Sequence, residues 1–210
     1  MDVWIIKETC LDNDYERVGT PLQDGWHIID IGAGLGDFTV YVAAKCPNST
    51  ILAFEPFPES FALLQENLAL NGIAHIVRPF PAAVSAKTGE LKLATTGAAV
   101  QHTTSQTAVS HATLTVPATS LADIFRQNHL PQCDFLKMDC EGGEFDILLN
   151  TPDDTLMKIR RICLEYHDNR TPYRHTALVD RLQMLGFSVK TAVNPAHAEL
   201  GFLYASLKEK

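Results

Sequence analysis

Short runs of hydrophobic residues alternate along this chain with longer stretches in which hydrophobic residues recur every three or four positions. The short runs predict buried strands, and the longer stretches predict helices with one apolar side. Strands are expected at 27–31, 50–55, 75–77, 133–138 and 159–165, and helices at 38–44, 60–70, 120–127, 144–149 and 175–185. Two more strands, 187–193 and 200–207, follow each other without a helix between them.

Alternation of strands and helices is typical of a parallel sheet that is covered on both faces. The last two strands should pair as an antiparallel hairpin at one edge, because no helix carries the chain across the sheet. We therefore expect an α/β fold: a doubly wound, seven-stranded, mostly parallel sheet with an antiparallel C-terminal hairpin strand. No repeat or linker divides the sequence, so 1–210 is expected to form one domain, with 1–24 as an N-terminal lead-in.

The segment 86–115 departs from this alternation. Thr88-Gly89 is followed by two leucines at alternate positions, which indicates a hairpin or edge strands. A polar stretch rich in Thr, Ser and His follows at 101–111. Such a stretch within a compact domain is usually a functional or disordered loop, so we expect an inserted hairpin with a polar loop.

Composition and charge narrow the classes of partner. The formal net charge of −8 argues against a nucleic-acid surface, which needs clustered Lys and Arg. No apolar run approaches the roughly 20 residues that span a bilayer, and the N-terminus does not resemble a signal peptide. The five cysteines are scattered and lack the spacing of metal ligands, which indicates free thiols in a reducing cytoplasm. The oligomeric state stays open.

The first expected strand leads into the glycine-rich turn Asp30-Ile31-Gly32-Ala33-Gly34-Leu35-Gly36. Ligands of open α/β sheets bind at such turns, beyond the carboxyl ends of the strands. A dinucleotide fingerprint starting at Gly32 would need its third glycine at position 37, which is Asp37. A negative charge there is also unfavourable beside a pyrophosphate. Glu55 ends the second strand, where a carboxylate can bind the ribose hydroxyls of a dinucleotide or of another nucleoside cofactor. Glu55 therefore does not distinguish the two classes of cofactor, whereas the glycine spacing does.

This turn resembles the first motif of Rossmann-like methyltransferases, in which an acidic residue precedes G-x-G-x-G. The resemblance implies S-adenosylmethionine as the cofactor, with the turn behind its methionine portion. The alternative is an NAD-type oxidoreductase, which Asp37 disfavours.

The fourth expected strand ends in a second motif rich in carboxylates. Strand side chains alternate, so Asp139 and Glu141 should project to the same side if the strand stays extended to 141. Gly142-Gly143 allows a sharp turn into the next helix. Glu144 would lie in the first turn of that helix, where the helix dipole favours a negative charge.

Five segments together resemble the FkbM family of methyltransferases: Lys137-x-Asp139-x-Glu141-Gly142-x-Glu144; Phe54-Glu55-Pro56; the pair Asn67 and Asn71; Ala83-Val84-Ser85 before Gly89-Glu90; and Leu164-Glu165-Tyr166-His167. The resemblance implies O-methylation of a hydroxyl, often on a sugar or a natural product. It implies a small-molecule or glycan acceptor and leaves that acceptor unidentified. It places the cofactor against Asp30, Gly32, Ala33, Gly34, Gly36, Glu55, Pro56, Ala83 and Asp139.

Methyl transfer is an in-line displacement that needs alignment of the acceptor and help from a base worth about 10²–10⁴-fold. The candidate bases are Asp139, Glu141, Glu165 and His167. His167 is attractive because the ordinary pKa of histidine suits proton transfer near neutrality. The same four residues suit a divalent cation such as Mg²⁺, although we assign no metal ligand. A non-catalytic cofactor-binding module would have no use for this carboxylate–histidine set.

Overall fold

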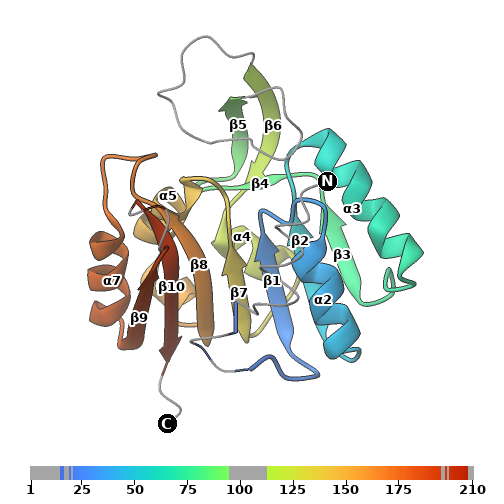
Figure 1. Ribbon diagram of the computed structural model, residues 1–210, viewed down its shortest axis with the longest axis horizontal. Helices are drawn as coiled ribbons and strands as arrows, with labels where there is room; N and C mark the ends of the chain where they lie inside the picture. Colours follow the sequence, from blue (N-terminus) through green and yellow to red (C-terminus); the bar gives the residue numbers. More distant parts are fainter. Residues whose placement is uncertain are drawn as a thin grey trace.

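A seven-stranded sheet runs through the molecule in the order β3-β2-β1-β7-β8-β10-β9 (Figure 1). The computed structural model describes residues 15, 16, 19, 21–94, 113–194, 197 and 199–207. Strands β3 to β8 of this order are parallel, whereas β10 is antiparallel to both β8 and β9. The mostly parallel sheet and its C-terminal hairpin confirm the fold class predicted from the sequence.

The strands of this sheet are β1 (His27–Ile31), β2 (Thr50–Phe54), β3 (Val77–Phe80), β7 (Phe135–Met138), β8 (Arg161–His167), β9 (Phe187–Val193) and β10 (Leu200–Leu207). The helices are α2 (Asp37–Lys45), α3 (Pro58–Leu70), α4 (Leu121–Gln127), α5 (Gly143–Asn150), α6 (Asp153–Leu156) and α7 (His175–Met184). Among these helices, none has the length and hydrophobicity that crossing a membrane needs.

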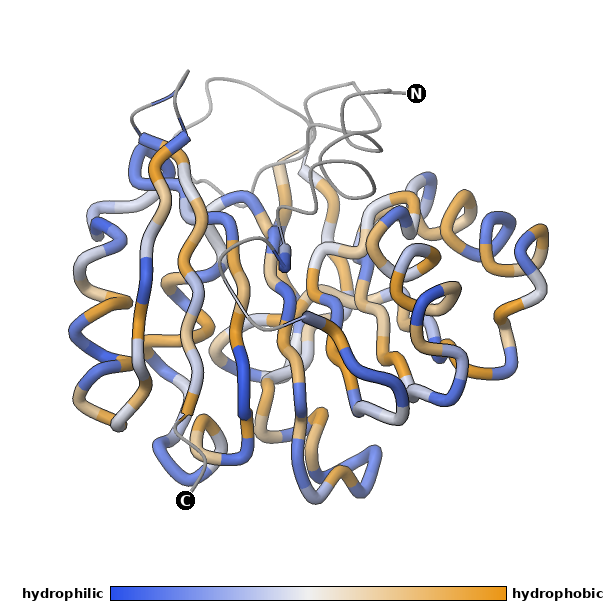
Figure 2. Tube along the Cα trace, turned by 60° about the horizontal axis from the view of Figure 1, so that its bottom comes forward, coloured by the Kyte–Doolittle hydropathy of each residue, from blue (hydrophilic) through white to orange (hydrophobic). Residues whose placement is uncertain are grey.

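Alternate residues of each central strand enter two separate cores, one on each face of the sheet. Ile29 and Ile31 pack with α4, α5 and α7, whereas Ile28 packs with α2 and α3. Figure 2 shows hydrophobic residues running through the strands and recurring along the helices. Burial on both faces explains why the strands appear in the sequence as short, nearly continuous apolar runs.

The strand order reverses between β1 and β7. From β1 the chain proceeds outward to β2 and β3, then returns to place β7 on the other side of β1. Such a reversal opens a crevice beyond the carboxyl ends of the two strands, where ligands of open α/β sheets bind. Both sequence motifs, the glycine turn after β1 and the carboxylates after β7, lie at this crevice.

The inserted hairpin is present, but it belongs to a second sheet that the sequence did not predict. β5 (Gly89–Ala94) pairs antiparallel with β6 (Thr113–Thr119), and β6 also pairs with β4 (Ala83–Val84). Leu93 and Val116 bury one side of this small sheet against Phe57, at the start of α3. In Figure 1 the β5–β6 hairpin rises beyond the main sheet. The polar loop 101–111 lies outside the described residues.

Two predicted strands are displaced along the chain. The expected strand 75–77 lies at Val77–Phe80, because Pro79 is tolerated in an edge strand and does not end it. The expected strand 159–165 lies at Arg161–His167, and Ile159 makes only an isolated bridge to Cys133. The short helix α6 was not predicted.

The structure also defines the cap of α4 and confirms free thiols at the described cysteines. The Ser120 hydroxyl accepts a hydrogen bond from the backbone N–H of Asp123 and so caps α4. The four cysteines among the described residues are free thiols: Cys46, Cys133, Cys140 and Cys163. Cys10 lies outside the described residues.

Candidate active site

The three glycines of the turn after β1 all adopt positive φ angles, 72° at Gly32, 53° at Gly34 and 86° at Gly36. A Cβ on Gly32 would lie 1.8 Å from the carbonyl oxygen of Asp139, and one on Gly36 would lie 2.5 Å from Leu64 Cδ1. A Cβ on Gly34 would meet nothing within 4 Å. Gly32 and Gly36 therefore allow the turn to pack against its neighbours, whereas Gly34 faces an opening.

A buried ion pair supports this turn. Lys137 Nζ donates a 2.7 Å hydrogen bond to the carbonyl oxygen of Gly32 and lies 3.1 Å from Asp30 Oδ1. Asp30 Oδ2 accepts a 2.7 Å hydrogen bond from the Thr39 hydroxyl. Burial alone would lower the pKa of Lys137, but the charges of Asp30 and Asp139 outweigh it and raise that pKa. Asp30 has no exposed surface, so it supports the turn from the interior of the protein.

Glu55 connects the end of β2 to the same turn. Its Oε2 accepts a 2.9 Å hydrogen bond from the backbone N–H of Gly34, and its Oε1 accepts one of 2.9 Å from Phe57. Burial raises the pKa of Glu55 to about 7, although these hydrogen bonds and Lys137 act to lower it. The carboxylate therefore titrates near neutral pH.

Three further residues were predicted to contact the cofactor. Ala33 is buried and its backbone N–H donates to the carbonyl oxygen of Phe54. Pro56 follows Glu55 and is half-buried. Ala83 is buried in β4, in the small cluster that also contacts Phe57.

The turn after β7 is held by Glu144 and not by continued extension of the strand. Glu144 Oε1 accepts a 2.8 Å hydrogen bond from the backbone N–H of Cys140, and its Oε2 accepts one of 3.0 Å from Gly142. Glu141 has a φ of +53°, in the left-handed region. The expectation that the strand stays extended to Glu141 is therefore wrong. The chain has already turned there.

His167, at the end of β8, lies between two carboxylates of this turn. Its Nδ1 is 3.5 Å from Glu144 Oε1, and its Nε2 is 3.6 Å from Glu141 Oε2. Burial alone would lower the pKa of His167, but the contact with Glu144 and the charges of Asp139 and Glu141 raise it to about 10. His167 is therefore an imidazolium at neutral pH, which removes the reason for choosing it as the base.

Tyr15, from the N-terminal lead-in, approaches the site from the α2 face. Its hydroxyl donates to Asp139 Oδ2 at 3.5 Å, and Lys137 Nζ lies 5.6 Å from the centre of its ring. Its hydroxyl pKa is raised by burial and by Asp139, Asp37 and Glu165. Glu165, on β8, pairs with Phe202 of β10, and the Phe202 ring contacts the ring of Tyr15.

The sequence predicted neither Tyr15 nor Lys137 as a site residue. A lysine inside the buried strand Phe135–Met138 was a usable indication, because a buried cation needs a partner. Nothing in the pattern around Tyr15 distinguished it.

The acidic residues suit a metal ion less well than the sequence suggested. Among the described residues, Asp139, Glu144 and His167 are the candidate ligands, with atoms within 4.8 Å of one another. However, both Glu144 oxygens already accept backbone hydrogen bonds, and a ligating histidine must be neutral. The protonated His167 already supplies the positive charge that these carboxylates need.

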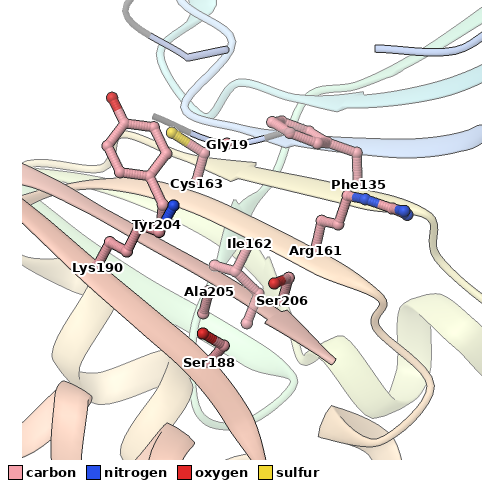
Figure 3. Close-up of a pocket in the computed structure, with 10 residues that line it drawn as sticks. All are labelled: Gly19, Phe135, Arg161, Ile162, Cys163, Ser188, Lys190, Tyr204, Ala205 and Ser206. Carbon is pink, nitrogen blue, oxygen red and sulfur yellow. The ribbon is translucent and has the colours of Figure 1, made fainter. Parts of the chain in front are cut away.

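A cavity of about 130 Å³ lies elsewhere on the sheet (Figure 3). Its lining comes from Gly19 and from β7, β8, β9 and β10. It includes Arg161, Lys190 and Tyr204, but none of the candidate site residues. Figure 3 shows Arg161 and Lys190 on different sides of this lining.

Residues 30–189 match the family model described as the methyltransferase FkbM domain. The chain belongs to the FkbM family of methyltransferases. The match begins at Asp30 and includes the glycine turn, Glu55, the Asp139–Glu144 segment and His167. Family membership confirms the resemblance drawn from the sequence and supports S-adenosylmethionine over a nicotinamide cofactor.

Known relatives agree with this assignment. The chain is 27% identical to methyltransferase 1 of Beauveria bassiana, over 89% of this chain and 81% of that protein. It is 25% identical to the 31-O-demethyl-FK506 methyltransferase FkbM of Streptomyces tacrolimicus, over 79% of this chain and 74% of that one. A crystal structure of methyltransferase FkbM from Methylobacillus flagellatus superposes with a TM-score of 0.63 at 15% identity. It covers 91% of this chain and 46% of that one, and it supports the fold alone.

Proposed function

We propose that this FkbM-family protein transfers the methyl group of S-adenosylmethionine to a hydroxyl oxygen of a small-molecule or glycan acceptor. The observation that carries the proposal is the opening at Gly34, which bonds Glu55 through its N–H and lies two residues after Gly32, the glycine that packs against Asp139. The cofactor fits there because Gly34 leaves room that a Cβ would fill and because Glu55 offers a carboxylate for ribose hydroxyls. When bound, the cofactor supplies an activated methyl group on its sulfonium.

Within this proposal, Asp139 accepts the proton of the acceptor hydroxyl. It is half-buried and lies at the end of β7, with Tyr15 on one side and His167 on the other. His167 already carries a proton at neutral pH and cannot take another. Glu144 and His167 instead position the turn, since Glu144 bonds two of its backbone N–H groups. A base placed in this way contributes about 10²–10⁴-fold to the rate.

The choice of oxygen as the methylated atom rests on two points. The segment after β7 contains neither an Asn-Pro-Pro-Tyr sequence nor a Pro-Cys pair, the signatures of amino and cytosine-carbon methylation. The printed name of the Streptomyces relative, 31-O-demethyl-FK506 methyltransferase, also indicates an oxygen acceptor for that protein.

The experiment is methyl transfer from radiolabelled S-adenosylmethionine to a panel of hydroxylated sugars and natural products, with wild type and Asp139→Asn. We expect label in at least one hydroxyl compound and a loss of about 100-fold or more in Asp139→Asn. The affinity for S-adenosylhomocysteine should stay within about threefold. Loss of that affinity would move Asp139 to the cofactor site, and labelling of amines alone would contradict the hydroxyl acceptor.

A further inference from the structure

Tyr15 and Glu16 lie outside the part of the chain that matches the FkbM family model, which begins at Asp30. Tyr15 nevertheless reaches the site, because its hydroxyl donates a hydrogen bond to Asp139 Oδ2. The family match assigns no role to either residue. Any role must therefore be read from the contacts that these two residues make.

The Tyr15 ring is held from several sides. The centre of the Phe38 ring, on α2, lies 5.1 Å from its centre, and that of the Phe202 ring, on β10, lies 5.7 Å away, both in edge-on contact. Lys137 Nζ, on β7, lies 5.6 Å from the centre of the same ring. Tyr15 is buried, and a ring packed in this way has little freedom to turn. The hydroxyl oxygen therefore has a fixed place beside Asp139.

Glu16 anchors the backbone of the same segment. Its carboxylate accepts hydrogen bonds from Lys45 Nζ at 2.7 Å, from the Tyr41 hydroxyl at 2.6 Å and from the backbone N–H of Leu22 at 2.6 Å. Burial alone would raise the pKa of Glu16, but the hydrogen bonds from Lys45 and Tyr41 lower it. The carboxylate is therefore ionised at neutral pH, and it ties Tyr15 and its neighbours to α2.

Tyr15 acts on Asp139 as a donor and not as a second base. Burial and the charges of Asp139, Asp37 and Glu165 raise the pKa of its hydroxyl, so the hydroxyl keeps its proton at neutral pH. The distance of 3.5 Å to Asp139 Oδ2 is long for a hydrogen bond. Hydrogen bonds of catalytic groups are often long in the free enzyme and tighten in the reacting complex.

We propose that Tyr15 is a positioning residue for methyl transfer, which holds Oδ2 of Asp139 and so presents Oδ1 to the acceptor hydroxyl. The inference rests on the proposed function, because it takes Asp139 as the base. In the step, the acceptor oxygen bonds the methyl carbon while the bond between that carbon and sulfur breaks. The acceptor proton moves to Oδ1, and the neutral thioether S-adenosylhomocysteine is released. Orientation matters here, because a misplacement of about 1 Å can cost about 10²-fold in rate.

The test is a double-mutant cycle of Tyr15→Phe and Asp139→Asn, with Tyr166→Phe as the matched control. Tyr166 is also buried, but its hydroxyl has no hydrogen-bond partner among the described residues. Both tyrosine substitutions keep the ring, so both variants should fold. Rates are measured with radiolabelled S-adenosylmethionine and the hydroxyl compound of the sugar and natural-product panel that the wild type labels.

Tyr15→Phe should lower kcat by about tenfold, the usual effect of losing a hydrogen bond to a charged group. Its KM for S-adenosylmethionine and its affinity for S-adenosylhomocysteine should equal those of the wild type, and Tyr166→Phe should keep the wild-type kcat. The double variant should be no slower than Asp139→Asn, because Tyr15 acts through the carboxylate that this substitution removes.

Three results would overturn this inference and leave the proposed function intact. Wild-type kcat in Tyr15→Phe would show that the hydroxyl does not position the base. Losses that multiply in the double variant would show that Tyr15 acts independently of Asp139. Weaker binding of S-adenosylhomocysteine by Tyr15→Phe would assign Tyr15 to the cofactor site. If the wild type labels no hydroxyl compound, the proposed function itself fails, and the role of Tyr15 fails with it.

Discussion

The glycine turn after β1 offers a test that separates stability from cofactor binding. Gly34 and Gly25 both have positive φ, 53° and 82°, and a Cβ on either would meet nothing within 4 Å. Gly25 lies in an exposed turn before β1, away from the crevice. Gly34→Ala and Gly25→Ala therefore impose the same backbone cost, and only Gly34→Ala adds a methyl group to the proposed cofactor opening.

The expected magnitudes follow from this geometry. A left-handed alanine costs about 1–2 kcal/mol, which lowers Tm by about 2–4 °C per kcal/mol in a chain of this size. Gly32→Ala should be worse, because its Cβ would lie 1.8 Å from the Asp139 carbonyl oxygen. Relieving that clash adds about 1–3 kcal/mol. Thermal unfolding should therefore rank Gly32→Ala as the least stable and the other two as similar.

Calorimetric titration with S-adenosylhomocysteine then separates the two similar variants. Gly34→Ala should lose at least about tenfold in affinity, equivalent to about 1.4 kcal/mol, because the methyl group fills space that the cofactor needs. Gly25→Ala should bind like the wild type. If Gly34→Ala has the stability of Gly25→Ala and wild-type affinity, the turn does not hold the cofactor and the reasoning fails.

Three more predictions concern the charged groups of the site. Lys137→Met leaves the Asp30 carboxylate buried without its cation, so the free energy of unfolding, measured by denaturant titration, should fall by about 3–5 kcal/mol. Adding Asp30→Asn should recover most of this loss. If the double variant recovers nothing, the Lys137–Asp30 ion pair is not the cause. Burial raises the pKa of Glu55 to about 7, and its ionised form binds ribose hydroxyls, so affinity for S-adenosylhomocysteine should rise about tenfold from pH 6 to pH 8. Glu55→Gln should abolish this pH dependence of the affinity. If the affinity of Glu55→Gln still changes with pH as in the wild type, another group causes the dependence. The carboxylates around His167 raise its pKa from 6.5 to about 10, so its stabilising effect is complete below pH 6.5 and is lost as the pH rises through 10. Tm should therefore fall more between pH 7.5 and 10 in the wild type than in His167→Gln, and equal falls would show that His167 is not the charged group.

The arrangement of the site could largely be predicted from local pattern. The apolar runs at 27–31 and 133–138 are buried strands, and parallel strands bring their carboxyl ends to one edge. That rule alone places the glycine turn beside Asp139. The boundaries were harder, because Pro79 in the edge strand β3 looks like the end of a strand in the sequence.

The roles of individual side chains depend on contacts between distant segments, which periodicity does not report. His167 has a typical pKa until Glu144, 23 positions earlier, and Glu141 are placed against it. Tyr15 reaches Asp139 across 124 positions. The left-handed turn at Glu141 also depends on Glu144, which holds the neighbouring backbone N–H groups. These contacts decide which group carries the proton, and the sequence left four candidates open.

The central claim is that the crevice beside Gly34 and Glu55 holds S-adenosylmethionine. The most direct measurement is a calorimetric titration of the wild-type chain with S-adenosylhomocysteine and, separately, with NADH. The account predicts saturable binding of S-adenosylhomocysteine at one site per chain, weakened at least about tenfold in Gly34→Ala, and no binding of NADH. Tight binding of NADH without binding of S-adenosylhomocysteine would contradict it.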